Sequence, residues 1–133
     1  MSINDFKIGM KETTSCIMSD NHIKTFANLS GDFNPIHISD EKASNSIWKR
    51  RICHGMLSAS LFSGLFGTRL PGPGSVYLSQ NLKFLRPVYI GDKVYATVEI
   101  LSINEHKKRI IFKTSCSVNN KIVISGKAEI FFP

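Results

Sequence analysis

The sequence predicts an α+β fold in which one long buried helix near the middle of the chain precedes an antiparallel sheet. Residues 54–67 carry apolar side chains around most of a helix circumference, which indicates a helix buried on most sides. After the turn at residues 71–74 the apolar period changes from helical to two, as in strands. Short turns such as Asn119-Asn120 make neighbouring strands antiparallel. The 133 residues suffice for one domain, which we expect to span residues 1–133.

The first third of the chain predicts one strand and then two short helices around a polar segment. Residues 10–18 form the strand, and Ser19 or Asp20 caps a helix that runs to about residue 29. Gly31 ends this helix, because glycine readily adopts a positive φ. Residues 39–41 look like the acidic start of another helix, which continues through residue 43. Four residues of the first helix are expected to face inward: Ile23, Phe26, Ala27 and Leu29.

The central helix and four strands complete the expected fold. Small residues such as Ser58, Ser60 and Gly64 keep the helix slim, so that a sheet can wrap closely around it. The strands cover residues 76–84, 94–100, 110–116 and 122–132. Gln80 lies on the otherwise apolar face of the first strand, so its amide needs a buried partner, which is either a ligand or a neighbouring backbone group. The apolar residues of that face are Val76, Leu78, Leu82 and Phe84.

The segment Gly31-Asp32-Phe33-Asn34-Pro35-Ile36-His37 brings a carboxylate, a carboxamide and an imidazole together within seven residues. Proline disfavours a helical conformation for the residue before it and suits the first position of a helix. We therefore expect Asn34 to be the N-cap, Pro35 the first helical residue and His37 the third. The break at Pro35 lets Asp32 fold back toward the imidazole. Spacing alone slightly favours an ordinary turn and helix cap over a catalytic pair.

Composition and motifs exclude several classes of protein. The net charge of +7 suits an anionic partner, but no zinc-finger spacing or RNP-type motif indicates nucleic acid. No apolar run is long enough to cross a bilayer, and the N-terminus is not a signal peptide. Three widely spaced cysteines favour a reducing cytoplasm over a disulfide framework. No metal-ligand spacing or glycine-rich phosphate loop is present, so we expect neither a metal nor a cofactor.

Residues 48–51, Trp-Lys-Arg-Arg, form a basic patch with one aromatic side chain. The patch has two interpretations: it contacts phosphates, or it is a solvated face beside a half-buried Trp48.

The segment at residues 31–37, followed by His54-Gly55-Met56, closely resembles the signature of the MaoC-like, (R)-specific enoyl-CoA hydratases, also called hydratase 2. The resemblance implies a hot-dog fold, a homodimer, and reversible addition of water to trans-2-enoyl-CoA to give (R)-3-hydroxyacyl-CoA without a cofactor. It continues in order along nearly the whole chain, through Phe62-Ser63-Gly64-Leu65, Pro71-Gly72, Tyr77-Leu78, Pro87-Val88 and Gly91-Asp92-Lys93-Val94.

The resemblance also implies roles for individual residues. Asp32 and His37 act as the acid–base pair, and Asn34 orients the water or the carboxylate. The backbone N–H of Gly55 serves as the oxyanion donor, whereas His54 is expected to be structural. The substrate-binding residues expected beside them are Ser63 and Phe66 at the acyl end, Gln80 on the first strand, and Lys83 and Arg86 at the coenzyme phosphates.

Alternatives remain at this stage. The same chemistry on acyl carrier protein would make the chain a 3-hydroxyacyl-carrier-protein dehydratase, and a non-catalytic acyl-CoA-binding module is the alternative of another class. A thioesterase on the same fold fits less well, because the complete Asp-x-Asn-Pro-x-His set belongs to the hydratases. Trp48 and Cys53 depart from the commoner family pattern and affect the expected shape of the acyl pocket. Apolar residues on the outward sheet faces favour a homodimer: Tyr95, Leu101, Ile103, Ile111, Val123 and Phe131.

Overall fold

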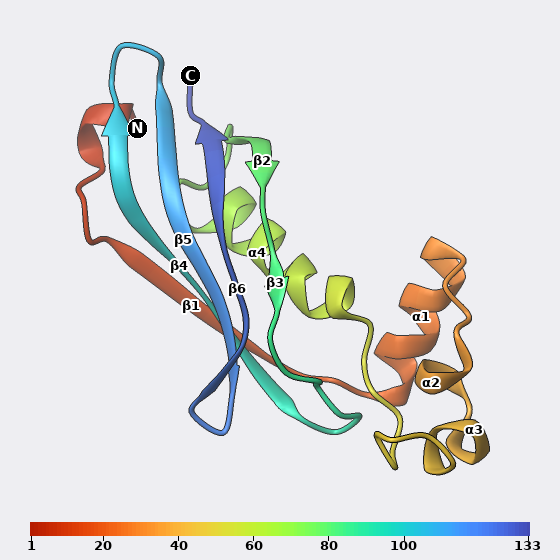
Figure 1. The fold of residues 1–133 in the computed structure, drawn as a ribbon. Coiled ribbons are helices and arrows are strands. Elements are labelled where there is room, and N and C mark those ends of the chain that lie inside the picture. Colours follow the sequence, from red (N-terminus) through yellow and green to blue (C-terminus); the bar gives the residue numbers. More distant parts are fainter.

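A computed structural model describes residues 1–133 and shows six strands in one antiparallel sheet. The strand order is β1-β4-β5-β6-β2, and β3 also pairs with β6 (Figure 1). The α+β prediction is confirmed. The strands are β1 (Lys11–Ile17), β2 (Val76–Gln80), β3 (Lys83–Phe84), β4 (Lys93–Asn104), β5 (Arg109–Val118) and β6 (Lys121–Phe131). The helices are η1 (Ile3–Asp5), α1 (Asp20–Ser30), α2 (Pro35–Ile38), α3 (Asp40–Ser44) and α4 (Gly55–Thr68).

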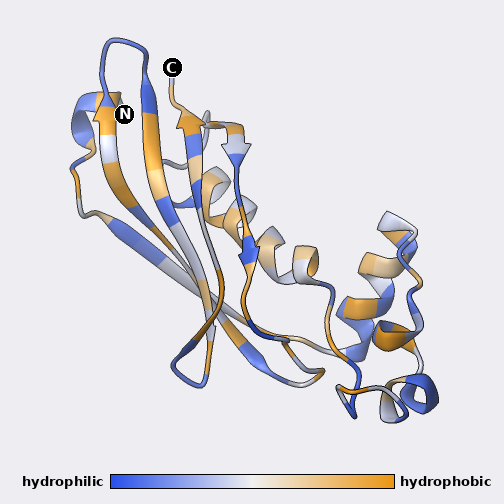
Figure 2. Ribbon diagram, in the orientation of Figure 1, coloured by the Kyte–Doolittle hydropathy of each residue, from blue (hydrophilic) through white to orange (hydrophobic).

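Helix α4 packs one side against the sheet and leaves the other side open. Its buried side meets the inward-facing residues of β4, β5 and β6 and forms the core of the protein. The opposite side exposes Ser63, Gly64 and Met56, which is 55% exposed. The prediction of a helix buried on most sides is therefore wrong for the single chain, although α4 is coloured white to orange along its length in Figure 2. The buried residues are Ser58, Ala59, Phe62, Leu65 and Phe66.

Helices α1, α2 and α3 lie together beyond one end of the sheet, near the start of α4 (Figure 1). Ser19 caps α1 by accepting a hydrogen bond from the His22 N–H, and Gly31 ends the helix with a φ of 77°. Leu29 is 85% exposed, so the prediction that it faces inward is wrong. Asn34 caps α2, as predicted, and Ser39 caps α3. No helix combines the length and the apolar composition that crossing a bilayer requires.

The segment predicted as one strand over residues 76–84 is broken into β2 and β3. At the break Asn81 exchanges hydrogen bonds with Lys127 of β6, donating its N–H at 3.0 Å and accepting through Oδ1 at 3.1 Å. A register shift between Tyr77 and Ser79 disturbs the alternation of β2 further. Val76 and Phe84 are consequently exposed rather than buried on one shared apolar face.

A second irregularity changes which residues of β6 face inward. The β5–β6 register shifts after Cys116, which pairs with Ile124, because Ser117 pairs with Ile122. Val123 is therefore the extra residue of a bulge, and it is buried whereas Ile122 is exposed. The expectation that Val123 faces outward is wrong, while Tyr95 is exposed as expected.

Candidate active site

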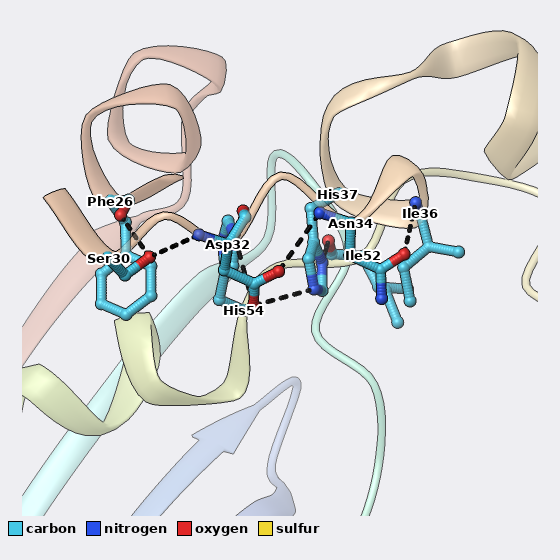
Figure 3. Close-up of polar contacts among 8 residues, drawn as sticks. All are labelled: Phe26, Ser30, Asp32, Asn34, Ile36, His37, Ile52 and His54. Carbon is cyan, nitrogen blue, oxygen red and sulfur yellow. Dashed lines mark hydrogen bonds and ion pairs between the residues drawn. The ribbon is translucent and has the colours of Figure 1, made fainter. Parts of the chain in front are cut away.

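The loop between α1 and α2 places a carboxylate beside an imidazole. The Asp32 N–H donates to the Ser30 hydroxyl at 3.2 Å, and Oδ1 of Asp32 accepts from the Asn34 N–H at 3.2 Å. The Asn34 side chain in turn accepts from the Ile36 N–H at 3.4 Å and caps α2. These bonds turn the chain sharply, so that Asp32 faces back toward His37, as Figure 3 shows.

Asp32 and His37 are separated by a gap that is too wide for a direct hydrogen bond. Oδ2 of Asp32 lies 4.0 Å from Nε2 of His37, and the Asp32 side chain is 48% exposed. A water molecule can hydrogen-bond to both atoms across such a distance. The pair predicted from the sequence is therefore brought together, in a geometry that can hold a water between two acceptors.

Hydrogen bonding determines which nitrogen of His37 carries the proton. Nδ1 of His37 lies 2.7 Å from the carbonyl oxygen of Ile52. Because a carbonyl can only accept, Nδ1 is the donor and Nε2 of the neutral ring keeps its lone pair toward Asp32. Burial lowers the pKa of His37 below its ordinary 6.5, and His54 lowers it further, against the opposing effects of Ile52 and Asp32. The neutral form, which can accept a proton at Nε2, is favoured.

His54 holds the Asp32 loop against the start of α4. Its Nε2 donates to the backbone carbonyl of Asp32 at 2.9 Å, and its ring is almost completely buried. The ring packs between Phe26 and His37, with centroid distances of 4.8 and 4.0 Å. These contacts agree with the structural role expected for His54.

The cluster of Asp32, His37 and His54 could offer three metal-ligand atoms within 4.8 Å of one another. Nε2 of His54, however, carries the hydrogen that it donates to Asp32 and therefore offers no lone pair to a cation. Two remaining ligands are fewer than protein metal sites ordinarily use. The arrangement suits acid–base chemistry better, and the absence of a metal stays a prediction.

An apolar cavity of about 390 Å³ opens beside His37 and the start of α4. As the first residue of α4, Gly55 has an N–H with no partner inside the helix, at the positive end of the helix dipole. A Cβ at Gly55 would lie 2.5 Å from the Phe84 ring, so only glycine fits without moving that ring. The cavity is lined by His37, Trp48, Ile52, Cys53, Gly55, Met56, Phe84, Leu85, Arg86, Pro87, Val88 and Ile124.

Two cysteine thiols are buried and protonated. Cys53 lines the cavity, and burial raises the pKa of its thiol to about 12. Burial also raises the pKa of Cys116 to about 12. Neither thiol is therefore a nucleophile at neutral pH.

The predicted substrate-binding residues are divided between several places. Arg86 lines the cavity and donates to the Ile122 carbonyl at 2.6 Å. Lys83 lines a separate depression that it shares with Lys113 and Lys127. Ser63 lies on the exposed side of α4.

Gln80 is satisfied within the protein. Its Nε2 donates to the Thr114 hydroxyl at 2.9 Å and to the Asn81 carbonyl at 2.8 Å, while its Oε1 accepts from the Tyr77 hydroxyl. Of the two alternatives, the structure supports the one in which the Gln80 amide hydrogen-bonds to neighbouring protein groups.

Phe66 belongs to the core rather than to the cavity, since its ring packs edge-on against Phe112 and Tyr77 at 4.8 and 5.1 Å. We expect Phe66→Ala to lower the free energy of unfolding by roughly 3–5 kcal/mol, as for other buried phenylalanines. Chemical denaturation measures this loss, and Phe66→Leu should lose much less. A clear shift toward longer acyl substrates with little loss of stability would instead support the acyl-pocket role expected from the sequence.

The sequence did not single out Ile52 and Leu85 as cavity residues, or Arg51 as a buried one, whereas Trp48, which was expected to affect the pocket, does line the cavity. Arg51 is 6% exposed, so the interpretation of residues 48–51 as a solvated patch is wrong for this residue. The one feature of the sequence that could have drawn attention to Arg51 is its position three residues before the His54-Gly55-Met56 motif. Trp48 is half-buried, as expected.

The fold and this site together define a hot-dog protein in which a carboxylate and an imidazole lie 4.0 Å apart beside an apolar cavity. The family model described as MaoC like domain matches residues 5–123, and the chain belongs to this family.

Similar proteins agree with this assignment. The (R)-specific enoyl-CoA hydratase of Rhodospirillum rubrum is 45% identical over 97% of this chain and 90% of its own length. A mitochondrial 3-hydroxyacyl-[acyl-carrier-protein] dehydratase of Arabidopsis thaliana is 36% identical over 96% of this chain and 78% of its own. The solved (R)-hydratase of Aeromonas caviae superposes with a TM-score of 0.94 at 40% identity, covering 96% of this chain and 98% of that one.

Proposed function

We propose that this protein is an (R)-specific enoyl-CoA hydratase, a single-domain hydro-lyase that adds water reversibly to trans-2-enoyl-CoA and uses no cofactor. The observation that carries the proposal is the 4.0 Å separation of Asp32 and His37 beside an apolar cavity that also contains Gly55. The identity to hydratases over nearly the whole chain supports it.

In the proposed mechanism a water bridges Oδ2 of Asp32 and Nε2 of His37. As the water oxygen bonds to Cβ of the enoyl thioester, Nε2 accepts one of its protons, and Asp32 orients the water through the other hydrogen. The electrons move onto the thioester oxygen, where the Gly55 N–H and the dipole of α4 stabilise the enolate. The proton on Nε2 then passes to Cα, so that one water is added across the double bond and the imidazole is neutral again.

The decisive experiment is hydration of crotonyl-CoA by the purified protein, followed as loss of the enoyl absorbance and repeated with longer enoyl-CoAs. We expect turnover with at least one chain length and no release of free CoA thiol. Thiol release without hydration would indicate a thioesterase. Binding of enoyl-CoA without turnover would indicate a non-catalytic module.

A carrier-protein substrate is the second candidate. The dehydratase relative of Arabidopsis thaliana and the chain's net charge of +7, which suits an acidic carrier protein, favour it. Comparing kcat/KM for the same acyl group on CoA and on acyl carrier protein decides between the two. We expect CoA to be preferred. Arg86, which lines the cavity, should then lie near the phosphates of the coenzyme.

The acid limb of activity should follow His37. Because burial lowers the pKa of His37 below 6.5, the neutral ring persists at pH 6.5, and kcat/KM should fall only as the pH drops through this lowered value. A profile of kcat/KM from pH 4.5 to 9 measures the limb. His22→Gln, at an exposed histidine, should leave it unchanged. An acid limb centred above 6.5 would contradict the assignment of neutral His37 as the base.

We also propose that the protein is a homodimer. The open side of α4 and the exposed apolar residues of β2 and β3, such as Leu78 and Phe84, are surfaces that a second copy would cover. Light scattering at micromolar concentration should report about twice the chain mass of 14.9 kDa. Leu78→Lys should shift the protein toward monomer, whereas Ile8→Lys, at an exposed residue elsewhere, should not. A fully active wild-type monomer would overturn the proposal.

A further inference from the structure

Arg51 is a buried arginine that the mechanism above does not use. Its side chain is 6% exposed, and charged side chains are almost never so deeply buried unless they are paired. Removing such a charge from water costs several kcal/mol, so its partners must stabilise it. The identity of those partners indicates what the residue does.

One guanidinium group contacts all three helices around the catalytic loop. Its Nε donates to the carbonyl oxygen of His37, near the end of α2, at 2.6 Å. Its Nη2 forms an ion pair with Oδ1 of Asp20, the first residue of α1, at 2.7 Å. Its Nη1 lies 3.9 Å from Oδ1 of Asp40, the first residue of α3. A planar fork of donors can meet these directions at once, whereas an ammonium group cannot.

The contact with His37 complements the one made by the next residue. Ile52 accepts from the His37 ring and donates its N–H to the Ile36 carbonyl at 3.1 Å. Arg51 and Ile52 thus hold the backbone and the side chain of the same histidine. Helix α2 has only four residues, so its own hydrogen bonds cannot make it rigid. The orientation of the imidazole therefore depends on these outside contacts.

We propose that Arg51 is a positioning residue for the hydration proposed above: by fixing the His37 carbonyl to α1 and α3, it aims Nε2 of the imidazole at the bridging water. Arg51 touches neither substrate nor water, and it acts through His37. A misplacement of about 1 Å can cost roughly 10²-fold in rate. Losing the contacts that Arg51 makes with His37, Asp20 and Asp40 should therefore lower kcat much more than it raises KM.

The kinetic test compares Arg51→Met with two controls. We expect Arg51→Met to lower kcat by about 10- to 100-fold and to change KM less than about 3-fold. Arg50→Met removes the neighbouring, exposed arginine, which contacts only the Ile90 carbonyl and the Tyr89 ring, and should retain wild-type kcat. Ile110→Val, in the core strand β5, lowers the melting temperature without touching the site and should also retain kcat. Equal losses of kcat in Arg51→Met and Ile110→Val would overturn the proposal.

A spectroscopic test is independent of turnover. Long-range ¹H–¹⁵N spectra distinguish a histidine protonated at Nδ1 from one protonated at Nε2. Wild-type His37 should be in the Nδ1–H form, and Arg51→Met should show a mixture of tautomers. An unchanged His37 spectrum in a folded Arg51→Met variant would overturn the proposal.

Two outcomes need a second measurement: an Arg51→Met variant that does not fold, and a wild-type protein that hydrates no enoyl thioester. If Arg51→Met does not fold, Arg51→Lys is measured in the same way, and it should show an intermediate loss of kcat and of the Nδ1–H form. Wild-type kcat and a wild-type His37 tautomer in Arg51→Lys would overturn the claim that a planar guanidinium group is required at this position. If the wild-type protein hydrates no enoyl thioester, the proposed function fails, and the tautomer of His37 still tests the positioning role.

Discussion

Asp32→Asn and His37→Ala should each lower kcat by orders of magnitude. His37→Ala removes the general base, which usually contributes roughly 10²–10⁴-fold. Asp32→Asn removes the carboxylate that orients the water, and misplacing a reacting group can cost roughly 10²-fold. Both side chains contact the same bridging water in the proposed mechanism. The His54 imidazole also lies 4.0 Å from Oδ2 of Asp32, but its Nε2 donates to the Asp32 carbonyl and so cannot replace the base. The double variant should be little worse than the worse single one, because residues that act as a unit are not additive. Initial rates of crotonyl-CoA hydration with each variant measure the effect.

Matched substitutions in the loop after β4 control for the loss of a charge or a ring. Glu105→Gln and His106→Ala change exposed residues far along the chain from the catalytic loop and should retain wild-type kcat. Circular dichroism should show that all variants are folded. A near wild-type rate in either Asp32→Asn or His37→Ala would remove the site assignment.

Gly126→Ala should strongly lower the free energy of unfolding. A Cβ at this position of β6 would lie 1.9 Å from the backbone oxygen of Asn81, at the break between β2 and β3. The backbone cannot move away freely, because Asn81 exchanges two hydrogen bonds with Lys127. Overpacking ordinarily costs about 1–3 kcal/mol, and a clash with main chain belongs at or above the upper end.

Urea denaturation measures this loss, with Ser125→Ala as the control on the same strand. Ser125 pairs with Lys83 and Ser115 through the backbone, so its truncation should change the free energy of unfolding little. A Gly126→Ala variant as stable as Ser125→Ala would show that the Asn81 turn can move away from β6.

Local patterns in the sequence predicted much of the fold and the centre of the site. The caps at Ser19 and Asn34 and the stop at Gly31 follow from chemistry that acts over a few residues. The alternation of β4 and β5 follows from a buried face. The return of Asp32 toward His37 follows from the break at Pro35, whereas the 4.0 Å gap between the two side chains was not predictable from the sequence.

Other features depend on contacts between distant residues, which local patterns do not encode. The bulge that buries Val123 arises from the pairing of β5 with β6. The burial of Arg51 depends on Asp20 and His37, which approach it only after three helices have packed together. The position of Phe66 on its helix suits either a pocket or the core. The choice depends on Phe112 and Tyr77, which come from the sheet and are distant in the sequence.

The buried thiols have a practical consequence for attaching reporter groups. With a pKa of about 12, Cys53 and Cys116 exist as thiolate at neutral pH in only about one molecule in 10⁵. Maleimide and iodoacetamide react through the thiolate, so both cysteines are protected without being mutated. Cys16, near the end of β1, is only half-buried, and we expect it to react with such reagents before the other two. The native chain therefore offers one attachment point for a fluorophore or spin label outside the cavity.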